Sequence, residues 1–289
     1  MKPAPFEYAP ARSAEEAVDL LSRHGDDAKV LAGGQSLMPM LNLRLARPLV
    51  LVDVNHATDL DYLRETEGVL VVGALLRQRK LERWSADRAP LIADAVRLIG
   101  HVAIRTRGTV VGSLAHGDPA SELPALLLCL DGAVVARGPG GERVIPARDL
   151  YVAPLTTSLG ADEVAVEARF SLPRQEAGWG LAEVARRHGD FALVGAVAVL
   201  WRGADDRVAG VRLALFGVGA TPVRSAAAEA ALVGEEPTPA RLRDAARAAA
   251  AALSPDGDLH ATADYRRRVA GVLAERTLAA AVGRARRAA

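Results

Sequence analysis

The sequence predicts an α+β protein of two domains. Its 289 residues, 50% of them hydrophobic, are enough to bury a core in each of two domains of ordinary size. Before residues 173–180, short helix and strand patterns alternate along the chain. After them, two long apolar runs are followed by a series of helical patterns. Neighbouring strands followed by helices are typical of a small α+β module, so we place a domain boundary near residue 173.

The first part of the chain predicts alternating helices and strands. Ser13 and Glu16 have capping-box spacing, and they precede a helical pattern that ends near Gly25. Three short apolar runs, each bounded by glycine or polar residues, predict strands at residues 29–32, 49–53 and 69–74. Helical patterns follow at residues 77–84 and 90–98.

The remaining elements alternate less regularly. We expect a helix at residues 122–130, and then a hairpin whose strands at 133–136 and 143–145 flank a glycine turn. In the C-terminal part, two apolar strands are expected at residues 193–201 and 208–218. Alanine-rich helical patterns then follow at residues 225–232, 239–253 and 264–282.

Charge and cysteine content exclude several classes of protein. The formal net charge is +1, which gives no electrostatic reason to expect a nucleic-acid partner. The only cysteine, Cys129, lies in a leucine-rich run, and this predicts a buried, inert thiol. One cysteine cannot hold an iron–sulfur cluster, which needs about four thiolates. The histidines lack metal-ligand spacing, so we predict no metal site, and any redox chemistry needs an organic cofactor.

The same features suggest where the protein is found. The N-terminus carries Pro3, Pro5 and Glu7 where a signal peptide has an apolar run. No stretch approaches the length of uninterrupted apolar sequence that spans a bilayer. A single cysteine also fits a reducing compartment. We therefore expect a cytoplasmic protein without a membrane span.

Two glycine segments are the most informative local features. The first is Gly33-Gly34 and the second is residues 107–113. In each we predict a strand followed by a tight turn, whose backbone N–H groups can approach an anion. Together the two turns could hold a diphosphate from two sides. Neither has a Rossmann or P-loop pattern, and taken alone each is better explained as an ordinary surface turn.

Five ordered segments together resemble one family, the FAD-binding medium subunits of molybdenum hydroxylases, which include carbon monoxide dehydrogenase and xanthine dehydrogenase. The first glycine segment reads LAGGQSL at residues 31–37 and continues to LRLARP at 43–48. The second contains RTRGT, GSLAH and DPASELP within residues 105–124. The other three are GDFA at 189–192, GVGATPVR at 217–224 and HATADYR at 260–266. The resemblance covers the chain from its N-terminus to about residue 282.

The resemblance implies a fold and a role. Residues 1–173 would form a two-lobed vanillyl-alcohol-oxidase-type (PCMH-type) FAD-binding domain, with lobes at about 1–55 and 56–173. Residues 174–289 would form the smaller α+β C-terminal domain of carbon monoxide dehydrogenase flavoproteins. FAD would receive electrons from iron–sulfur clusters on a partner chain and pass them to an external acceptor. The implied partners are a molybdenum-cofactor large subunit and a [2Fe-2S] small subunit, in a dimer of heterotrimers.

The resemblance also implies cofactor contacts but no catalytic residue in this chain. The FAD diphosphate would be held by backbone amides of Ala32, Gly33, Gly34, Gln35, Ser36, Thr109, Gly112 and Ser113, and Leu37 and Val111 would be further cofactor contacts. Glu122 would be an acidic FAD contact, and Phe191 would limit access to the isoalloxazine or would simply be core. His116 is either a phosphate or ribityl contact or a structural histidine, and Asp118 is either a ligand or a turn residue.

Some positions depart from the family pattern. Val111 replaces a glycine, and if that position needs a positive φ, valine costs on the order of 1–3 kcal/mol in strain. Glu183 stands where many relatives have lysine, and its charge would repel a nearby diphosphate or flavin anion. Arg105 and Arg107 could attract a phosphate, but we expect them to face a partner subunit or solvent.

Two other functions remain open at this point. A stand-alone FAD-dependent oxidase or dehydrogenase with the same fold would act on its own small substrate, and it would need an acid or base that the sequence does not identify. A scaffold or assembly protein that has lost FAD is the other alternative, and Val111 and Glu183 are its only support.

Overall fold

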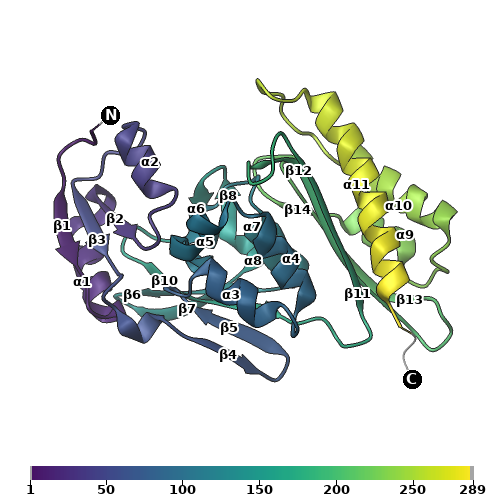
Figure 1. Ribbon diagram of the computed structural model, residues 1–289, viewed down its shortest axis with the longest axis horizontal. Coiled ribbons are helices and arrows are strands. Elements are labelled where there is room, and N and C mark those ends of the chain that lie inside the picture. The colour runs from purple at the N-terminus through teal and green to yellow at the C-terminus, as the bar shows by residue number, and fades with distance from the viewer. Residues whose placement is uncertain (1, 287–289) are drawn as a thin grey trace.

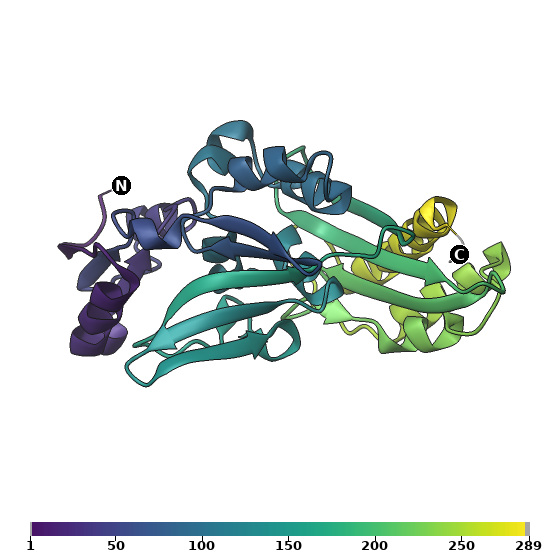
Figure 2. The same cartoon turned by 90° about the horizontal axis from the view of Figure 1, so that it is seen from below.

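The chain is elongated, with three main sheets arranged one after another along its length (Figure 1). The computed structural model describes residues 2–286. Viewed from a second direction, the N-terminal part, the central sheet and the C-terminal part still follow one another along the long axis (Figure 2). No helix within residues 2–286 is long and apolar enough to cross a membrane.

A small parallel sheet forms the N-terminal end. Its strands are ordered β1 (Glu7–Pro10), β3 (Val50–Asp53), β2 (Ala28–Leu31), and β3 is buried throughout. The predicted helix is α1 (Ala14–His24), and the Ser13 hydroxyl accepts a hydrogen bond from the Glu16 N–H at 3.1 Å. A 3₁₀ turn, η1 (Gly25–Asp27), and the short helix α2 (Leu37–Asn42) flank β2.

The central sheet is antiparallel and has five strands. Their order is β4 (Leu63–Thr66), β5 (Val69–Gly73), β10 (Val164–Ser171), β6 (Ala133–Gly138) and β7 (Gly141–Pro146). The hairpin of β6 and β7 confirms the sequence prediction, with Gly138 opposite Gly141. The middle strand β10 and the edge strand β4 have no counterpart in the elements expected from the sequence.

Helices and short turns connect and cover these strands. The helical elements are η2 (Thr58–Leu60), α3 (Gln78–Ser85), α4 (Pro90–Leu98), α5 (Val102–Arg107), α6 (Val110–His116), α7 (Glu122–Cys129) and α8 (Ala147–Leu150). A separate two-stranded sheet is formed by β8 (Tyr151–Ala153) and β9 (Thr156–Thr157). The predictions for α3, α4 and α7 are confirmed to within a residue or two.

The prediction of a strand before the second glycine segment is wrong. Residues 102–107 form α5 instead, in which Ile104 N–H donates to the His101 carbonyl and Gly108 N–H to the Ile104 carbonyl. Val102 and Ile104 suggest a strand by composition, but both are exposed and no sheet lies beside them. The buried side chain of Arg105 fixes this turn of helix, because its charge is paired inside the protein.

The C-terminal domain is a four-stranded antiparallel sheet with helices on one face. Its strands are β11 (Gly178–Ala185), β12 (Ala192–Arg202), β13 (Val208–Phe216) and β14 (Val223–Arg224). The helices are α9 (Ala226–Leu232), α10 (Pro239–Ala251) and α11 (Ala263–Arg284), all close to their predicted positions. Because Gly180 has no side chain, α11 can approach β11: a Cβ there would lie 2.1 Å from the Thr277 carbonyl oxygen.

The other face of this sheet packs against the N-terminal domain. Val197, Val199 and Phe216 belong to the same buried cluster as the leucines of α7. Cys129 ends α7 in this interface, fully buried, with its sulfur 3.6 Å from the Val197 carbonyl oxygen. Burial raises the pKa of the Cys129 thiol to about 12, which confirms the predicted inert thiol.

Candidate cofactor-binding site

The first glycine segment leaves β2 and presents a row of free backbone donors. Within the described part of the chain, no protein acceptor is bonded to the N–H groups of residues 32–37. Gly34 has a φ of +70°, a conformation that favours glycine, and it turns the chain into α2. The Gln35 side chain donates to the Gly33 carbonyl at 3.0 Å and so closes the turn. Successive free N–H groups in such a turn form a concave site for an anion.

The second glycine segment lies directly against the first. A Cβ built on Gly33 would lie 2.6 Å from the Arg107 carbonyl oxygen and 2.8 Å from the Gly108 Cα. Gly112 lies near Ala32, because its Cβ position is 3.9 Å from the Ala32 methyl carbon. The two turns therefore meet, as a site that holds one diphosphate requires.

Thr109 and its neighbours shape the second turn. The Thr109 hydroxyl accepts the Gly112 N–H at 3.1 Å and caps α6, and the Ser113 N–H donates to the Thr109 carbonyl. The expectation that the Gly112 and Ser113 amides hold the diphosphate is therefore wrong, because Thr109 accepts both of them. The N–H groups of Thr109 and Val111 have no protein acceptor among residues 2–286.

Val111 does not carry the strain that a positive φ would impose. It lies in α6, and its φ is not among the positive values found in the described residues. Its side chain is 1% exposed and belongs to the N-terminal core, so only its backbone can reach a ligand. Since valine suits a buried helical position, the strain considered for Val111 does not arise.

A hydrogen-bond network connects the two turns, and the sequence analysis did not predict it. The Asn55 amide donates to the Ala32 carbonyl at 2.9 Å, and its oxygen accepts from Arg77 at 2.7 Å. The other end of the Arg77 guanidinium donates to the Arg107 carbonyl at 2.6 Å. Arg77 thus ties the first turn, through Asn55, to the second. The only sequence signal was the position of Asn55 just after the buried strand β3.

Arg105 and Arg107 have different environments. Arg105 is buried: it donates to Glu82 at 3.0 Å and to the Ile99 and Gly100 carbonyls at 2.8 and 3.0 Å. The expectation that Arg105 faces solvent or a partner subunit is therefore wrong, because this guanidinium holds the α4–α5 turn inside the protein. Arg107 is exposed beside the glycine turns, and its backbone carbonyl is used by Arg77.

The residues after α6 lead towards the C-terminal domain. His116 is the last residue of α6, and burial lowers its pKa below that of a free imidazole. Asp118 accepts the Ala120 N–H at 2.8 Å, which is the geometry of the turn residue considered for it. Glu122 is 5% exposed at the start of α7, and burial raises its pKa to about 8.

Phe191 lies on the surface rather than in the core, with an exposed fraction of 57%. Its segment is fixed by Gly189, whose φ of +87° lets it lie against Gly100: a Cβ there would be 3.0 Å from Gly100 backbone atoms. The core alternative for Phe191 is therefore wrong, and its ring is available for contact with a ligand.

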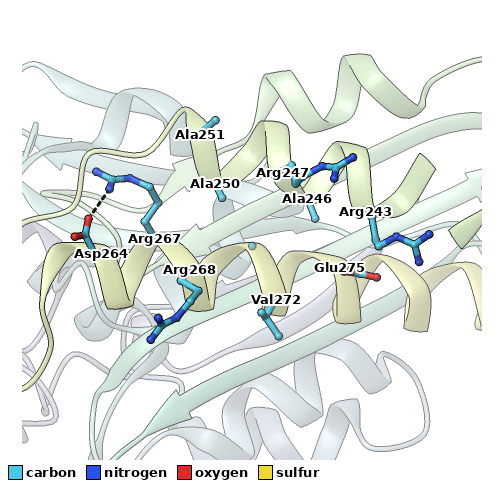
Figure 3. Close-up of a pocket in the computed structure, with 11 residues that line it drawn as sticks. Arg243, Ala246, Arg247, Ala250, Ala251, Asp264, Arg267, Arg268, Val272 and Glu275 are labelled. Carbon is cyan, nitrogen blue, oxygen red and sulfur yellow. Dashed lines mark hydrogen bonds and ion pairs between the residues drawn. The ribbon is translucent and has the colours of Figure 1, made fainter. Parts of the chain in front are cut away.

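A separate cavity of about 560 Å³ lies between α10 and α11 (Figure 3). Its lining includes the arginines Arg243, Arg247 and Arg268 and the small residues Ala250 and Gly271. It lies in the outer helical layer of the C-terminal domain, away from the glycine turns (Figure 1). It is therefore not part of the site formed by the two turns.

Comparisons with known proteins agree with this geometry. Residues 4–174 match the family model "FAD binding domain in molybdopterin dehydrogenase", and residues 179–281 match "CO dehydrogenase flavoprotein C-terminal domain". The chain is 38% identical to the carbon monoxide dehydrogenase medium chain of Hydrogenophaga pseudoflava over 286 residues, covering 98% of this chain and 99% of that one. It is 40% identical to the alpha subunit of the 6-hydroxypseudooxynicotine dehydrogenase complex of Paenarthrobacter nicotinovorans over 288 residues, covering 99% and 97%.

Solved structures show the same fold. A chain of carbon monoxide dehydrogenase from Hydrogenophaga pseudoflava superposes with a TM-score of 0.96 at 39% identity, covering 99% of this chain and all of that one. A chain of quinoline 2-oxidoreductase from Pseudomonas putida 86 gives a TM-score of 0.91 at 33% identity, covering 98% and 99%. The chain therefore belongs to the family of FAD-binding medium subunits of molybdenum hydroxylases such as carbon monoxide dehydrogenase, and it is an oxidoreductase subunit with FAD as its cofactor.

Proposed function

We propose that this chain holds FAD between its two glycine turns and passes electrons from iron–sulfur clusters on a partner chain, through FAD, to an external acceptor. The observation that carries the proposal is the contact between the turns around a row of free backbone N–H groups. FAD supplies the redox chemistry, while the protein binds, orients and shields it. The chain's single buried cysteine cannot ligate a cluster, so the clusters belong to another chain.

The residues present fit a diphosphate. Free N–H groups at residues 32–37, together with those of Thr109 and Val111, can satisfy several anionic oxygens without charged side chains. Gly33 and Gly112 contribute by lacking a side chain, because a Cβ at either position would meet backbone or the Thr109 hydroxyl. The Ser113 hydroxyl at the same turn is a further donor to the diphosphate.

The flavin half of FAD belongs on the side of the C-terminal domain. Phe191 presents an exposed ring there, and an apolar ring that FAD covers would be shielded from water. Its role is to limit access to the isoalloxazine, and Glu122 lies near this end of the cofactor. His116 and Asp118 lie in the segment between the second glycine turn and Glu122, and Asp118 acts mainly as a turn residue there.

The proposed assembly contains a molybdenum-cofactor large subunit and a [2Fe-2S] small subunit, in a dimer of heterotrimers in the cytoplasm. The names of the relatives support it, because several are medium chains or subunits of dehydrogenase complexes. Within this chain we propose domains at residues 1–173 and 174–289, divided between the end of β10 and the start of β11. The N-terminal domain would comprise lobes at about 1–55 and 56–173, one for each glycine turn.

Two experiments test the proposal. Purified chain mixed with FAD and freed of excess cofactor should keep the absorbance bands of an oxidised flavin. Co-expression with the large and small subunits encoded beside it should give a complex in which the hydroxylase substrate reduces this flavin. Flavin that stays oxidised in an intact complex while the clusters are reduced would contradict the electron path.

A further inference from the structure

The cavity between α10 and α11, called the α10–α11 groove below, is open to solvent on the outer side of the C-terminal domain (Figures 1 and 3). The two helices touch where Gly271 meets Ala250: a Cβ on Gly271 would lie 3.3 Å from the Ala250 methyl carbon. Small residues at a helix contact leave room beside it, because no large side chain fills the space between the two backbones. The groove is this space, and its volume is about 560 Å³.

Both helices carry apolar residues on their outer side as well as on their inner side. The inner side packs in the core of the C-terminal domain, through residues such as Leu242 of α10 and Leu273 of α11. The groove is lined by further apolar residues, none of which is buried: Ala250, Ala251, Gly271 and Val272. Val272 is 44% exposed. A surface helix ordinarily presents polar residues to solvent, so this apolar lining is not explained by packing within the domain.

The lining residues follow one stripe on each helix. On α10 the stripe runs from Arg243 to Ala251, and on α11 it runs from Asp264 to Glu275. The spacing within each stripe is three or four residues, which keeps the side chains on one face of the helix. The longer stripe extends for about 16 Å, or roughly three helical turns. The groove therefore has the length of a short helix.

Arginines stand on both sides of the apolar lining (Figure 3). Two of them have acidic partners: Arg247 pairs with Asp244, and Arg267 donates to Asp264 at 3.0 Å. Two others, on opposite helices, have no acidic partner among residues 2–286, and these are Arg243 and Arg268. The only acidic lining residue without a cationic partner in the described part of the chain is Glu275. The groove thus keeps an excess of positive charge.

The whole segment that forms the groove is basic. Residues 239–286 contain nine arginines, no lysine and five acidic residues, so their formal net charge is +4, although the complete chain carries only +1. The rest of the chain is therefore net negative, and the positive charge is concentrated in this helical layer. Such a concentration of one sign attracts a partner of the opposite sign and speeds its association.

We propose that the α10–α11 groove binds an acidic amphipathic helix of a partner protein. Apolar side chains of that helix would cover the apolar lining, and its carboxylates would pair with Arg243 and Arg268. A helix seated in an apolar groove contacts it through residues spaced three and four apart, which matches the stripes on α10 and α11. A membrane surface or a nucleic-acid backbone would contact the arginines but leave the apolar lining uncovered. The site goes beyond the function proposed above, because it lies away from the glycine turns and needs no FAD.

The first experiment uses two synthetic peptides of about 15 residues, somewhat longer than the groove. One places leucines three and four residues apart on one helical face and glutamates elsewhere. The other has the same composition in a scrambled order without an apolar face. Fluorescence anisotropy with the whole chain should show binding of the amphipathic peptide, at least about tenfold tighter than that of the scrambled one. Equal binding would mean that the groove only attracts negative charge, and it would overturn the proposal.

Variants then locate the peptide. Reversal of both unpaired arginines, Arg243→Glu with Arg268→Glu, should weaken the amphipathic peptide by at least about tenfold, because two attractions become repulsions. Val272→Asn should weaken it by about fivefold, because an apolar contact is lost. Arg23→Glu, at an exposed position of α1 at the opposite end of the molecule, is the matched control and should bind as the wild type does (Figure 1). Wild-type affinity in the double variant would overturn the proposal.

A third measurement separates a helix from other acidic partners. Phosphatidylserine vesicles and a short DNA duplex replace the peptide, with the wild type and the double variant at positions 243 and 268. Neither probe should bind in a way that depends on these two arginines. Binding of vesicles or DNA that the double variant loses, in a protein that does not bind the amphipathic peptide, would assign the groove to a different kind of partner and overturn the proposal.

Discussion

At the scale of single residues, the site depends on glycines, because a residue without a side chain lets two backbone segments approach each other closely. Gly33 is the clearest case, since its Cα faces the backbone of the second turn, which cannot move aside as a flexible side chain could. The same turn carries the free N–H groups that we assign to the diphosphate. A methyl group there would separate the two turns and move these donors away from one another.

Gly33→Ala should therefore weaken FAD binding by at least about tenfold, or ~1.4 kcal/mol. Titration of purified variant protein with FAD measures this. Gly140→Ala is the matched control, because its Cβ would meet nothing within 4 Å. FAD affinity unchanged in Gly33→Ala would mean that the diphosphate is not held between the turns.

Arg77 is a positioning residue, since it bonds to the Arg107 carbonyl and to Asn55, which holds the first turn, and to none of the donors assigned to FAD. Arg77→Ala removes both bonds at once, and FAD affinity should fall by about tenfold, the effect of losing one to two net hydrogen bonds. Arg83→Ala, at an exposed position of α3, the helix that begins directly after Arg77, should leave the affinity unchanged. A merely structural role would lower the melting temperature of the cofactor-free protein without weakening FAD binding, so both quantities are measured.

At the scale of elements, a buried ion pair holds α5 against α3. Glu82 and Arg105 have side chains only 9% and 7% exposed, and their atoms lie 3.0 Å apart. Burial raises the pKa of Glu82, but the bonds from Arg79 and Arg105 outweigh burial and keep the pKa below its ordinary value. Loss of one partner from a buried pair costs about 3–5 kcal/mol, because the other charge stays buried.

Glu82→Gln tests this pair through pH. A lowered carboxyl pKa stabilises the fold above the ordinary glutamate pKa of about 4.3, and this stabilisation disappears as the pH falls through the folded pKa. The wild type should therefore lose more stability than Glu82→Gln between pH 6 and pH 3 in urea unfolding. Asp61→Asn, which removes an exposed partner of Lys80, is the control and should behave as the wild type. A Glu82→Gln variant with the wild-type acid sensitivity would show that the pair adds no pH-dependent stability.

At the scale of the whole molecule, the two domains share one core. Phe216 of β13 is fully buried in the cluster formed mainly by the N-terminal domain. Arg224 donates to Asp131 at 2.6 Å across the same boundary. Such an interface couples the unfolding of the two domains.

Calorimetry should therefore show a single unfolding transition. Phe216→Ala should move that whole transition to lower temperature, with a loss of about 3–5 kcal/mol. Leu259→Ala, at a fully exposed position, should not move it. Two separated transitions, of which only one responds to Phe216→Ala, would contradict a shared core.

The sequence by itself determined the local elements whose signals are local. Ser13 and Pro90 mark helix starts, and the glycine hairpin of β6 and β7 follows from residues near one another in the chain. It also determined the family, because the ordered motifs lie in one linear order and the comparisons confirm them.

Tertiary structure alone decided how distant residues meet. The bonds of Arg77 to Asn55 and to the Arg107 carbonyl, the burial of Arg105, and the exposure of Phe191 depend on residues far apart in the chain. The same holds for β10, which is a central strand only because β5 and β6 pair with it on either side. Local patterns carry propensity and periodicity, but the environment of a side chain is set by whichever distant segments pack against it, and only folding brings these together.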